Sequence, residues 1–402
     1  MTDFDCIVVG GGASGLFYGA LENNIKKGLI LDKGPCGLKL LLSGSGQCNI
    51  THDGSIKDFI DKYGLNGRKI RSVLYGANNI FLRNFLESCG IRTVSREDGK
   101  VFPASMKSSE ILNMLLNKCS ENSFEIHRNE GVTDIVYKDG LYHVITDKRT
   151  YKTRRLVMAC GGRSYPKTGS DGSIMPVIEK LGIRIVPQKP ALAPVYVHSY
   201  PFRECAGISF KNIDISILEN NREIASVNDD LLLTHRSFSG PAVLTLSRYA
   251  EPGYELLVNY VSMDKKQVQN KIKETFHSSR KELHTYISSL FSLPQGFTMA
   301  VLKTGSLCPY LKASSLTGEE IEEISVLLSE GRYSISGVGG YNEAMVTCGG
   351  VSLDEINLKT MESLKYKDLF FIGEILDIDG DTGGYNLQFA FSSAKAALKK
   401  DV

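Results

Sequence analysis

The sequence contains no apolar run that approaches the roughly 18 residues of a membrane-spanning helix. It also lacks a dominant charge, since 47 Lys and Arg residues are balanced by 45 Asp and Glu residues and the formal net charge is +2. Such a balance gives no general attraction to nucleic acids or anionic lipids. The chain enters an apolar strand almost at once, which leaves no room for a signal peptide. We therefore expect a cytoplasmic protein that acts on a small molecule, with no membrane or nucleic-acid partner. The sequence does not predict its oligomeric state.

Closely spaced cysteines are absent as well. The nine cysteines are scattered, and none forms a C-x-x-C motif or another pair with metal-ligand spacing. This spacing argues against a zinc site, a disulfide framework and the redox pair of disulfide reductases. We expect no metal, and we expect most of these thiols to be small buried side chains.

Internal repeats are missing too, and only one segment has the pattern of a dinucleotide-binding turn. The apolar strand Cys6–Val9 runs into Gly10-Gly11-Gly12-Ala13-Ser14-Gly15, and a helix over Ser14–Asn24 is expected to follow. Gly10 permits the tight turn, Gly12 lets the backbone approach a pyrophosphate, and Gly15 allows close packing of helix on strand. Backbone N–H groups and the positive end of the helix would then face the phosphates.

An acidic residue follows at the distance expected for a ribose ligand. The strand Gly28–Leu31 ends in Asp32-Lys33, about 20 residues after the glycines. A carboxylate at this place accepts hydrogen bonds from an unphosphorylated adenosine ribose, as in FAD or NAD. A glycine-rich turn alone could merely join two elements. Here, however, the turn lies between a strand and a helix, and a second strand that ends in an acid follows at the expected distance. This order of elements predicts a dinucleotide site.

The chain then alternates between helical and strand-like segments. Helices are expected over 79–88 and 108–121, and strands over 131–137, 141–146 and 155–159. The last of these strands is apolar throughout, which is typical of a strand buried on both faces of a parallel sheet. The short strands before it predict a β-hairpin crossover that leads back into the sheet.

A domain boundary is expected at Val186–Pro194, where three prolines lie close together. Strand-like alternation follows to about Tyr260, and a polar, lysine-rich helical stretch continues to about Glu330, whose charges predict a solvated surface. Gly337-Val338-Gly339-Gly340 has no amphipathic helix after it and predicts a loop. We expect a dinucleotide-binding domain in two parts, an inserted β-rich domain in two parts and a helical subdomain, over 1–190 with 347–402, 191–262 with 331–346, and 263–330.

Two further glycine-rich segments could contact a cofactor. Lys39–Thr51 supplies backbone N–H groups and short polar side chains that can wrap a phosphate or a ring edge. Near the other end, the strand Leu369–Ile372 runs into Gly373-Glu374, where the carboxylate can bind a polyol hydroxyl such as that of ribitol. Gly383-Gly384 then precedes a helix expected over Phe389–Leu398. N–H groups at this turn would stabilise an anionic reduced flavin.

Two side chains are candidates for an acid or base. His235, within Thr234-His235-Arg236-Ser237-Phe238-Ser239-Gly240-Pro241, can titrate near neutral pH. Tyr385 follows Gly384, and a phenol beside a flavin can donate a proton. A purely structural role is the alternative for both residues.

These segments together resemble the BaiN-like family of NAD(P)/FAD-dependent oxidoreductases, also described as aminoacetone-oxidase-family flavoproteins. The resemblance spans nearly the whole chain and rests on Gly10–Gly15, Lys39–Thr51, Gly99–Pro103, Thr234–Pro241 and Gly373–Gln388, of which the last is the most specific. The family implies an α/β fold with a glutathione-reductase-type Rossmann FAD-binding domain, made of a parallel sheet and a β-hairpin crossover. It also implies an inserted β-rich domain and a small helical cap.

The resemblance further implies a set of FAD contacts. The pyrophosphate and the adenosine ribose would be held by Gly10, Gly12, Ala13, Ser14, Gly15, Asp32 and Lys33. The phosphate and flavin side would be lined by Lys39, Ser43, Gly44, Gly46, Cys48 and Asn49. The adenine would contact the backbone of Val132, with Ala159, Gly161 and Gly162 nearby. The ribitol and the flavin ring would meet Gly373, Glu374, Gly384, Asn386, Leu387 and Gln388.

Two departures from the family pattern bear on the substrate. The family has Arg before the cysteine of the first loop, where this chain has Gln47, and a small or aromatic pair after T-H, where it has Arg236-Ser237. The first removes a positive charge near the cofactor or substrate, and the second changes a loop expected to face the active site.

We expect an FAD-dependent oxidoreductase that transfers hydride through flavin N5. The resemblance to the family implies, as the first expectation, reduction of a C=C bond in a small, steroid-like substrate, with NAD(P)H as a transient electron donor. The alternatives are an amine oxidase that uses O2, a flavin-dependent RNA-modifying or RNA-binding protein, and a binding module without catalysis. The near-neutral charge argues against the RNA alternative.

Overall fold

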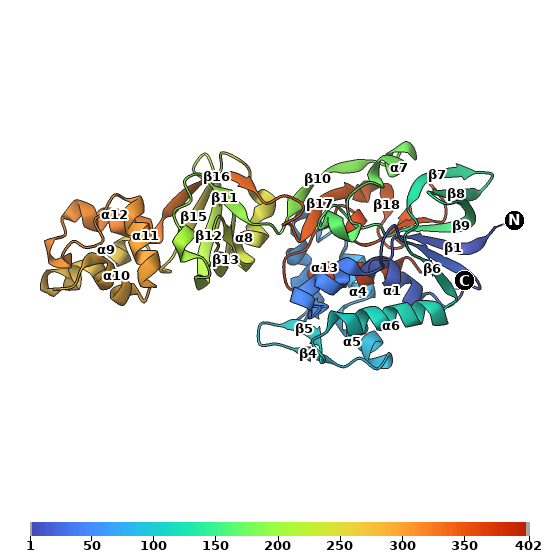
Figure 1. The fold of residues 1–402 in the computed structure, drawn as a ribbon, viewed down its shortest axis with the longest axis horizontal. Helices are drawn as coiled ribbons and strands as arrows, with labels where there is room; N and C mark the ends of the chain where they lie inside the picture. Colours follow the sequence, from blue (N-terminus) through green and yellow to red (C-terminus); the bar gives the residue numbers. More distant parts are fainter. Residues whose placement is uncertain (1, 399–402) are drawn as a thin grey trace. The chain divides into compact units, whose positions relative to one another are not determined.

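The computed structural model describes residues 2–398. The chain forms two compact units (Figure 1): unit 1 comprises the chain up to Pro190 and from Met345 onward, and unit 2 comprises Ala191–Ala344. Each unit has a hydrophobic core of its own, as expected of a domain. Among the described residues, no helix is both long and apolar enough to cross a bilayer.

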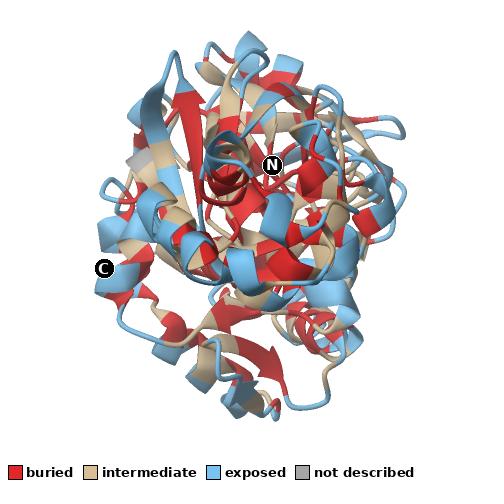
Figure 2. Ribbon diagram, turned by 90° about the vertical axis from the view of Figure 1, so that its left-hand side faces the viewer, coloured by how far each residue is buried: buried red, intermediate tan, exposed pale blue. Residues whose placement is uncertain are grey.

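The core of unit 1 is a mostly parallel sheet with the strand order β18-β19-β20-β9-β1-β2-β6. Strand β1 (Phe4–Val9) lies between β2 (Gly28–Leu31) and β9 (Thr150–Met158), and both pairings are parallel. Strands β6 (Phe124–His127) and β20 (Leu369–Phe371) extend the parallel part on either side. The central strands are buried along nearly their whole length (Figure 2), as is typical of a parallel sheet covered on both faces. The antiparallel edge consists of β18 (Ile356–Asn357) and β19 (Glu362–Ser363).

The predicted β-hairpin crossover is present. Strands β7 (Val132–Lys138) and β8 (Leu141–Thr146) pair antiparallel, and β8 continues the ladder onto β9. Strand β9 is shared, because residues 150–153 pair with β8 and residues 156–158 pair with β20. A strand from the C-terminal part thus completes the sheet that the N-terminal part begins. The fold is the Rossmann type expected from the sequence.

Helices of unit 1 connect and cover these strands. Helix α1 (Ala13–Leu21) contacts both α6 (Ser108–Glu121) and α13 (Tyr385–Ala396). A small sheet joins β3 (Thr51–His52), β5 (Lys100–Pro103) and β4 (Thr93–Ser95). The shorter helices are α2 (Leu38–Leu42), α3 (Ile56–Ile60), α4 (Arg71–Gly76), α5 (Asn79–Ser88) and α7 (Met175–Lys180).

Several element bounds differ from those predicted. Helix α1 ends at Leu21 rather than Asn24, because Glu22 is extended and its buried carboxylate pairs with Arg155. The last helix starts at Tyr385 rather than Phe389, because Gly384 at φ 95° forms its N-terminal boundary. The proline-rich segment forms a strand, β10 (Ile185–Ala191), which pairs with β17 (Val346–Val351) in a two-stranded sheet where every position is at an edge.

Unit 2 contains a closed antiparallel barrel. Closure pairs every barrel strand on both sides and leaves no open sheet edge. The strand-like stretch is interrupted by the short helix α8 (Pro241–Leu246), and Gly337 and Val338 lie in the last barrel strand rather than in a loop. In spatial order the barrel strands are β11 (Val195–Val197), β14 (Phe238–Ser239), β13 (Arg222–Leu233), β12 (Ser209–Glu219), β15 (Glu255–Asn259) and β16 (Gly331–Val338).

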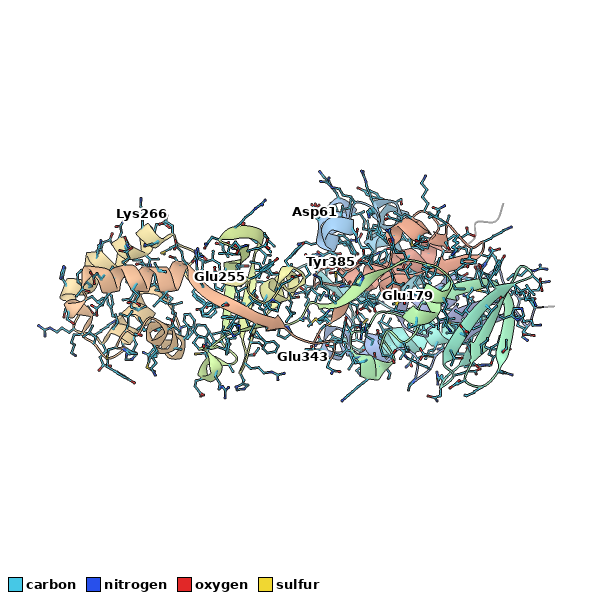
Figure 3. The ribbon with its side chains drawn as sticks, turned by 90° about the horizontal axis from the view of Figure 1, so that it is seen from above. Asp61, Glu179, Glu255, Lys266, Glu343 and Tyr385 are labelled. Atoms are coloured by element: carbon cyan, nitrogen blue, oxygen red, sulfur yellow. The ribbon has the colours of Figure 1, made fainter. Side chains whose placement is uncertain are left out.

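A helical subdomain is inserted between the adjacent barrel strands β15 and β16. Capping boxes start two of its helices, at Asp264 and Gln267 for α9 and at Thr317 and Glu320 for α12. These two helices pack against each other. Figure 3 labels Lys266 on α9 and Glu255 on β15. The helices are α9 (Lys265–Thr275), α10 (Leu283–Phe291), α11 (Gln295–Thr304) and α12 (Gly318–Ser329).

Candidate cofactor site

The glycines of the first turn have two different roles. Gly10 and Gly15 are required by the packing of the fold, whereas Gly12 leaves room for a ligand. Gly10 has φ 107°, and a Cβ there would lie 2.4 Å from the carbonyl oxygen of Ala159. A Cβ on Gly15 would lie 2.0 Å from the carbonyl oxygen of Gly10. A Cβ on Gly12, in contrast, would meet nothing within 4 Å. Gly12 therefore borders open space beside the start of α1.

The start of α1 is available to an anion. Gly12 immediately precedes the helix, and no side chain caps its first turn. The first N–H groups of a helix have no partner within it, and here they belong to Ala13, Ser14 and Gly15. Together with the helix dipole they suit a phosphate. This part of the site therefore fits the pyrophosphate of FAD.

Asp32 is held in place by two backbone N–H groups. Gly11 donates to Oδ2 and Gly34 donates to Oδ1, both at 2.8 Å. Burial raises the pKa of the Asp32 carboxyl above its usual value, although these two hydrogen bonds act in the opposite direction. The neighbouring Lys33 pairs with Asp171 and donates to Ser173 Oγ at 2.8 Å. Asp32 is thus positioned for ribose hydroxyls, whereas Lys33 is engaged with the turn after β9.

Residues from the two ends of the sequence meet at an ion pair. Lys39 Nζ lies 2.8 and 2.6 Å from the two carboxylate oxygens of Glu374, which follows β20. The backbone N–H of Thr347 donates to the same carboxylate at 2.9 Å. Gly373 passes so close to α1 that a Cβ on it would lie 2.5 Å from Ser14 Oγ. Glu374 is therefore near the start of α1, where the ribitol would follow a bound pyrophosphate.

The glycine-rich loop after α2 reaches the start of α13. Gly44 and Gly46 have φ of 55° and 85° in the short turn over Ser43–Gly46. In the amide orientation that satisfies both of its groups, Asn49 donates to the backbone and accepts from Gly384 N at 3.1 Å. Glycine is needed at 384, since a Cβ would lie 2.5 Å from the carbonyl oxygen of Thr51.

Polar side chains at the start of α13 are used within the fold. Gln388 is fully buried, accepts from Thr51 Oγ1 at 2.6 Å and donates to the carbonyl oxygen of Ala77 at 2.9 Å. Asn386 binds both the N–H and the carbonyl of Gly380, each at 2.8 Å. These side chains fix the conformation of the glycine turn. They would therefore contribute to flavin binding indirectly, by positioning the backbone N–H groups of the turn.

The two candidate acids belong to different units. Tyr385, labelled in Figure 3, stacks on His52 with ring centroids 5.3 Å apart and meets Phe59 edge-on at 5.0 Å. Burial, with the charges of Asp381 and Asp58, raises the pKa of Tyr385 to about 12, which keeps the phenol protonated at neutral pH. His235 is exposed in a barrel loop of unit 2.

The remaining predicted contacts surround the same end of the sheet. Ala159, Gly161 and Gly162 follow β9, and Ala159 donates to the carbonyl oxygen of Val9 at 2.8 Å. Val132 starts β7. Three further predicted contacts lie in the loop after α2 and in α13. The hydroxyl of Ser43 donates to the carbonyl oxygen of Leu40, Cys48 is buried and has a backbone φ of 61°, and Leu387 is partly buried.

Thr347 is a site residue that the sequence analysis missed. Its Oγ1 accepts from the N–H groups of Arg163 at 2.7 Å and Ser164 at 3.1 Å, and its own N–H binds Glu374. Thr347 therefore ties the turn after β9 to the carboxylate. The only local signal was its place at the start of a glycine-bearing stretch.

The two departures from the family pattern have partners in the structure. Gln47 Oε1 accepts from Arg96 Nη2 at 2.7 Å, and the Arg96 guanidinium lies 4.0 Å from the ring centroid of Phe102. Arg96 thus brings a positive charge to the loop position where Gln47 replaces one. In unit 2, the carboxylate of Glu343 accepts from Arg236 and Tyr196, both at 2.7 Å.

Comparison with known proteins gives a family and several relatives. The family model described as HI0933-like protein Rossmann domain matches residues 4–400. The ribosomal RNA dihydrouridine synthase of Escherichia coli (strain K12) is 28% identical, over 99% of this chain and 98% of that protein. The 3-dehydro-bile acid delta(4,6)-reductase of Clostridium scindens is 26% identical, over 97% of each. Among solved structures, a variant of E. coli quinol fumarate reductase FrdA has a TM-score of 0.51 and 13% identity over 98% of this chain and 69% of its own, a likeness of fold.

Proposed function

Because the chain belongs to the HI0933-like family and is an FAD-dependent oxidoreductase of the Rossmann type, we propose that it reduces a C=C bond conjugated to a carbonyl group. The observation that carries this proposal is the single site built by both ends of the sequence. There the open turn at Gly12, the fixed carboxylate of Asp32 and the Lys39–Glu374 pair suit the pyrophosphate, ribose and ribitol of one FAD.

Each part of the site has a stated task in this proposal. FAD, when bound, would accept a hydride from NADH or NADPH at N5 and, once reduced, would donate it to the substrate. The start of α1 holds the pyrophosphate, and Asp32 accepts the ribose hydroxyls. Glu374 orients the ribitol, and the ion pair with Lys39 holds that carboxylate in place. NADH or NADPH is the proposed electron donor. Since no second strand–G-x-G-x-x-G–helix unit occurs in the sequence, the donor would bind transiently and leave.

The reaction also needs a proton from the protein. Hydride adds to the carbon β to the carbonyl, and a proton adds to the α-carbon. We propose Tyr385 as the donor, because its phenol is protonated at neutral pH and, within residues 2–398, its hydroxyl has no hydrogen-bond partner. His235 is the second candidate.

For the substrate we propose the uracil base of an RNA, with a steroid-like enone as the second candidate. The uracil ring and a 3-dehydro bile acid with a delta(4) bond both contain C=C conjugated to a carbonyl, so one mechanism serves both. The relative named for dihydrouridine synthesis is 28% identical over nearly its whole length, against 26% for the bile-acid reductase. This order reverses the one expected from the sequence, where the family resemblance put a steroid-like substrate first and the near-neutral net charge argued against RNA.

An anaerobic two-step experiment tests this function. NADH and NADPH are added separately to FAD-loaded protein, and an unmodified ribosomal RNA transcript or a steroid enone follows. We expect at least one nicotinamide to bleach the flavin and the RNA to restore its colour, with uridines that gain two hydrogens by mass spectrometry. Recovery with the enone alone would favour the second candidate. Peroxide formed from an amine in air, without nicotinamide, would favour an amine oxidase and contradict the proposal.

A further inference from the structure

The near-neutral net charge hides an uneven distribution in the helical subdomain. From Ser262 to Ala313 the sequence has eight Lys or Arg residues and three Asp or Glu residues. From Thr317 to Glu330 it has five Glu residues and no Lys or Arg. Helix α12 carries most of these acids, and its Glu322 pairs with Lys265 of α9 at 2.7 Å. The acids of α12 thus offset the positive charge of α9. The cations of the subdomain that lie outside α9 are not offset in this way.

Two short segments bring several of those cations together. Residues 280–284 run antiparallel to residues 310–313, with Glu282 opposite Lys312. Leu283 donates to the Leu311 carbonyl at 2.7 Å, and Ala313 donates to the Lys281 carbonyl at 3.0 Å. Because side chains alternate between the faces of such a pair, residues 280, 282, 310 and 312 lie on the face away from the buried Leu283 and Ala313.

This face and the neighbouring exposed Lys281 form the surface named here the Arg280–Lys312 surface, which consists of Arg280, Lys281, Tyr310 and Lys312 and has the partly exposed Glu282 directly across from Lys312. The side chain of Tyr310 is 60% exposed, and its hydroxyl contacts Met299 Sδ at 3.9 Å. His284 supports it edge-on, with ring centroids 5.6 Å apart.

The charges of this surface remain available to a ligand. Lys312 Nζ contacts the Arg280 carbonyl at 3.4 Å, and Lys281 Nζ contacts Ser289 Oγ at 3.2 Å. Within the described part of the chain, no carboxylate forms an ion pair with any of the three cations. Glu282 is the only acid between 279 and 313, and it lies 3.7 Å from His284.

We propose that the Arg280–Lys312 surface binds RNA, with its cations on phosphates and Tyr310 stacked against an unpaired base. Exposed aromatic rings beside a basic track are how proteins hold single-stranded nucleic acids, and Lys or Arg contacts to phosphate dominate the affinity. The inference rests on the RNA substrate of the proposed function and adds the place where the strand is held.

Binding of a labelled, uridine-rich single-stranded oligoribonucleotide to the full FAD-loaded protein tests this surface by fluorescence anisotropy. We expect the double variant R280E/K312E to bind about tenfold more weakly or worse, and the slope of log affinity against log salt to shrink by about 2. Tyr310→Ala should lose about tenfold, whereas Tyr310→Phe keeps the stacking ring and should bind like the parent. The matched control K152E/R154E reverses two exposed charges on β9 and should also bind like the parent.

Three results would overturn the surface: no binding by the parent, an equal loss in both double variants, or parental binding by R280E/K312E. Thermal unfolding of each variant checks that the fold persists. The surface and the reaction are separable, because binding needs no turnover. A parent that binds RNA through this surface but adds no hydrogen to uridine refutes the proposed function and leaves the surface standing.

Discussion

Lys39 and Glu374 are 335 residues apart in the sequence, yet Lys39 Nζ lies 2.6 Å from Glu374 Oε2. One follows β2 and the other follows β20, so the pair joins the two parts of the chain that build unit 1. Both side chains are mostly buried, with 26% and 20% of their surfaces exposed. The pair therefore places a fixed carboxylate beside the start of α1, where we put the ribitol of FAD.

Replacing Glu374 with Gln keeps the size of the side chain and removes its charge. We expect FAD to bind about tenfold more weakly, since a hydrogen bond to a charged group contributes about 1.5–3 kcal/mol. Affinity is measured by titrating the apoprotein with FAD and following flavin fluorescence. Asp230→Asn is the control, because it breaks the ion pair with Lys211 in unit 2 and should leave FAD affinity unchanged. Parental affinity in E374Q would contradict the position of the ribitol.

Gly12 and Gly15 make a matched pair for the pyrophosphate site. In Gly12→Ala the added methyl meets no protein atom within 4 Å, so the apoprotein should unfold like the parent while FAD binds at least about tenfold more weakly. In Gly15→Ala the methyl would lie 2.0 Å from the Gly10 carbonyl oxygen, so the apoprotein itself should lose about 1–3 kcal/mol or more. Urea unfolding and FAD titration of both variants separate the two effects. Parental FAD affinity in G12A would contradict the placement of the pyrophosphate at this turn.

The raised pKa of Asp32 predicts the pH dependence of FAD binding. Only the ionised carboxylate can accept from both ribose hydroxyls, so affinity should fall as the pH drops through this pKa, at a higher pH than for an exposed aspartate. The stability of the apoprotein should change with the opposite sign. Because the folded state binds this proton more tightly, the contribution of Asp32 is present at low pH and is lost as the pH rises through the raised pKa. Affinities measured between about pH 4 and 7 check this, and Asp32→Asn should abolish the dependence. A flat profile in the parent would refute the role.

Tyr385→Phe removes only the hydroxyl from the aromatic cluster with His52 and Phe59. We expect flavin reduction by NADH or NADPH to keep its parental rate, while transfer to the substrate slows about 100-fold through loss of the proton donor. Stopped-flow absorbance resolves the two half-reactions. His235→Gln is the comparison. A slow substrate step in H235Q with a normal one in Y385F would assign the proton to the barrel loop.

Features that depend on local backbone chemistry could be predicted from the sequence. The turn from Gly10 to Gly15, the acid at Asp32 and the glycine boundary at Gly384 all lie in elements of the expected type. The inserted barrel followed from alternation, and its closed form did not. Residue alternation identifies strands but does not say how they pair around a circle.

Features that depend on distant partners could not be predicted. Thr347 binds the N–H of Arg163 across 184 residues, and no local pattern announces such a contact. Helix α1 ends early because the buried Glu22 pairs with Arg155. The balanced net charge did not indicate the Arg280–Lys312 surface. The acids of α12 offset the cations of this surface in the net charge, but they lie on a different element.

The visible spectrum of the purified protein, recorded after incubation with FAD and removal of the unbound excess, tests the central claim most directly. We predict the absorption of an oxidised flavin in the parent, bleached without air by NADH or NADPH, and a folded G12A protein that retains less flavin than the parent. A parent that remains colourless while its circular dichroism shows a folded chain would contradict the cofactor site and the oxidoreductase built on it.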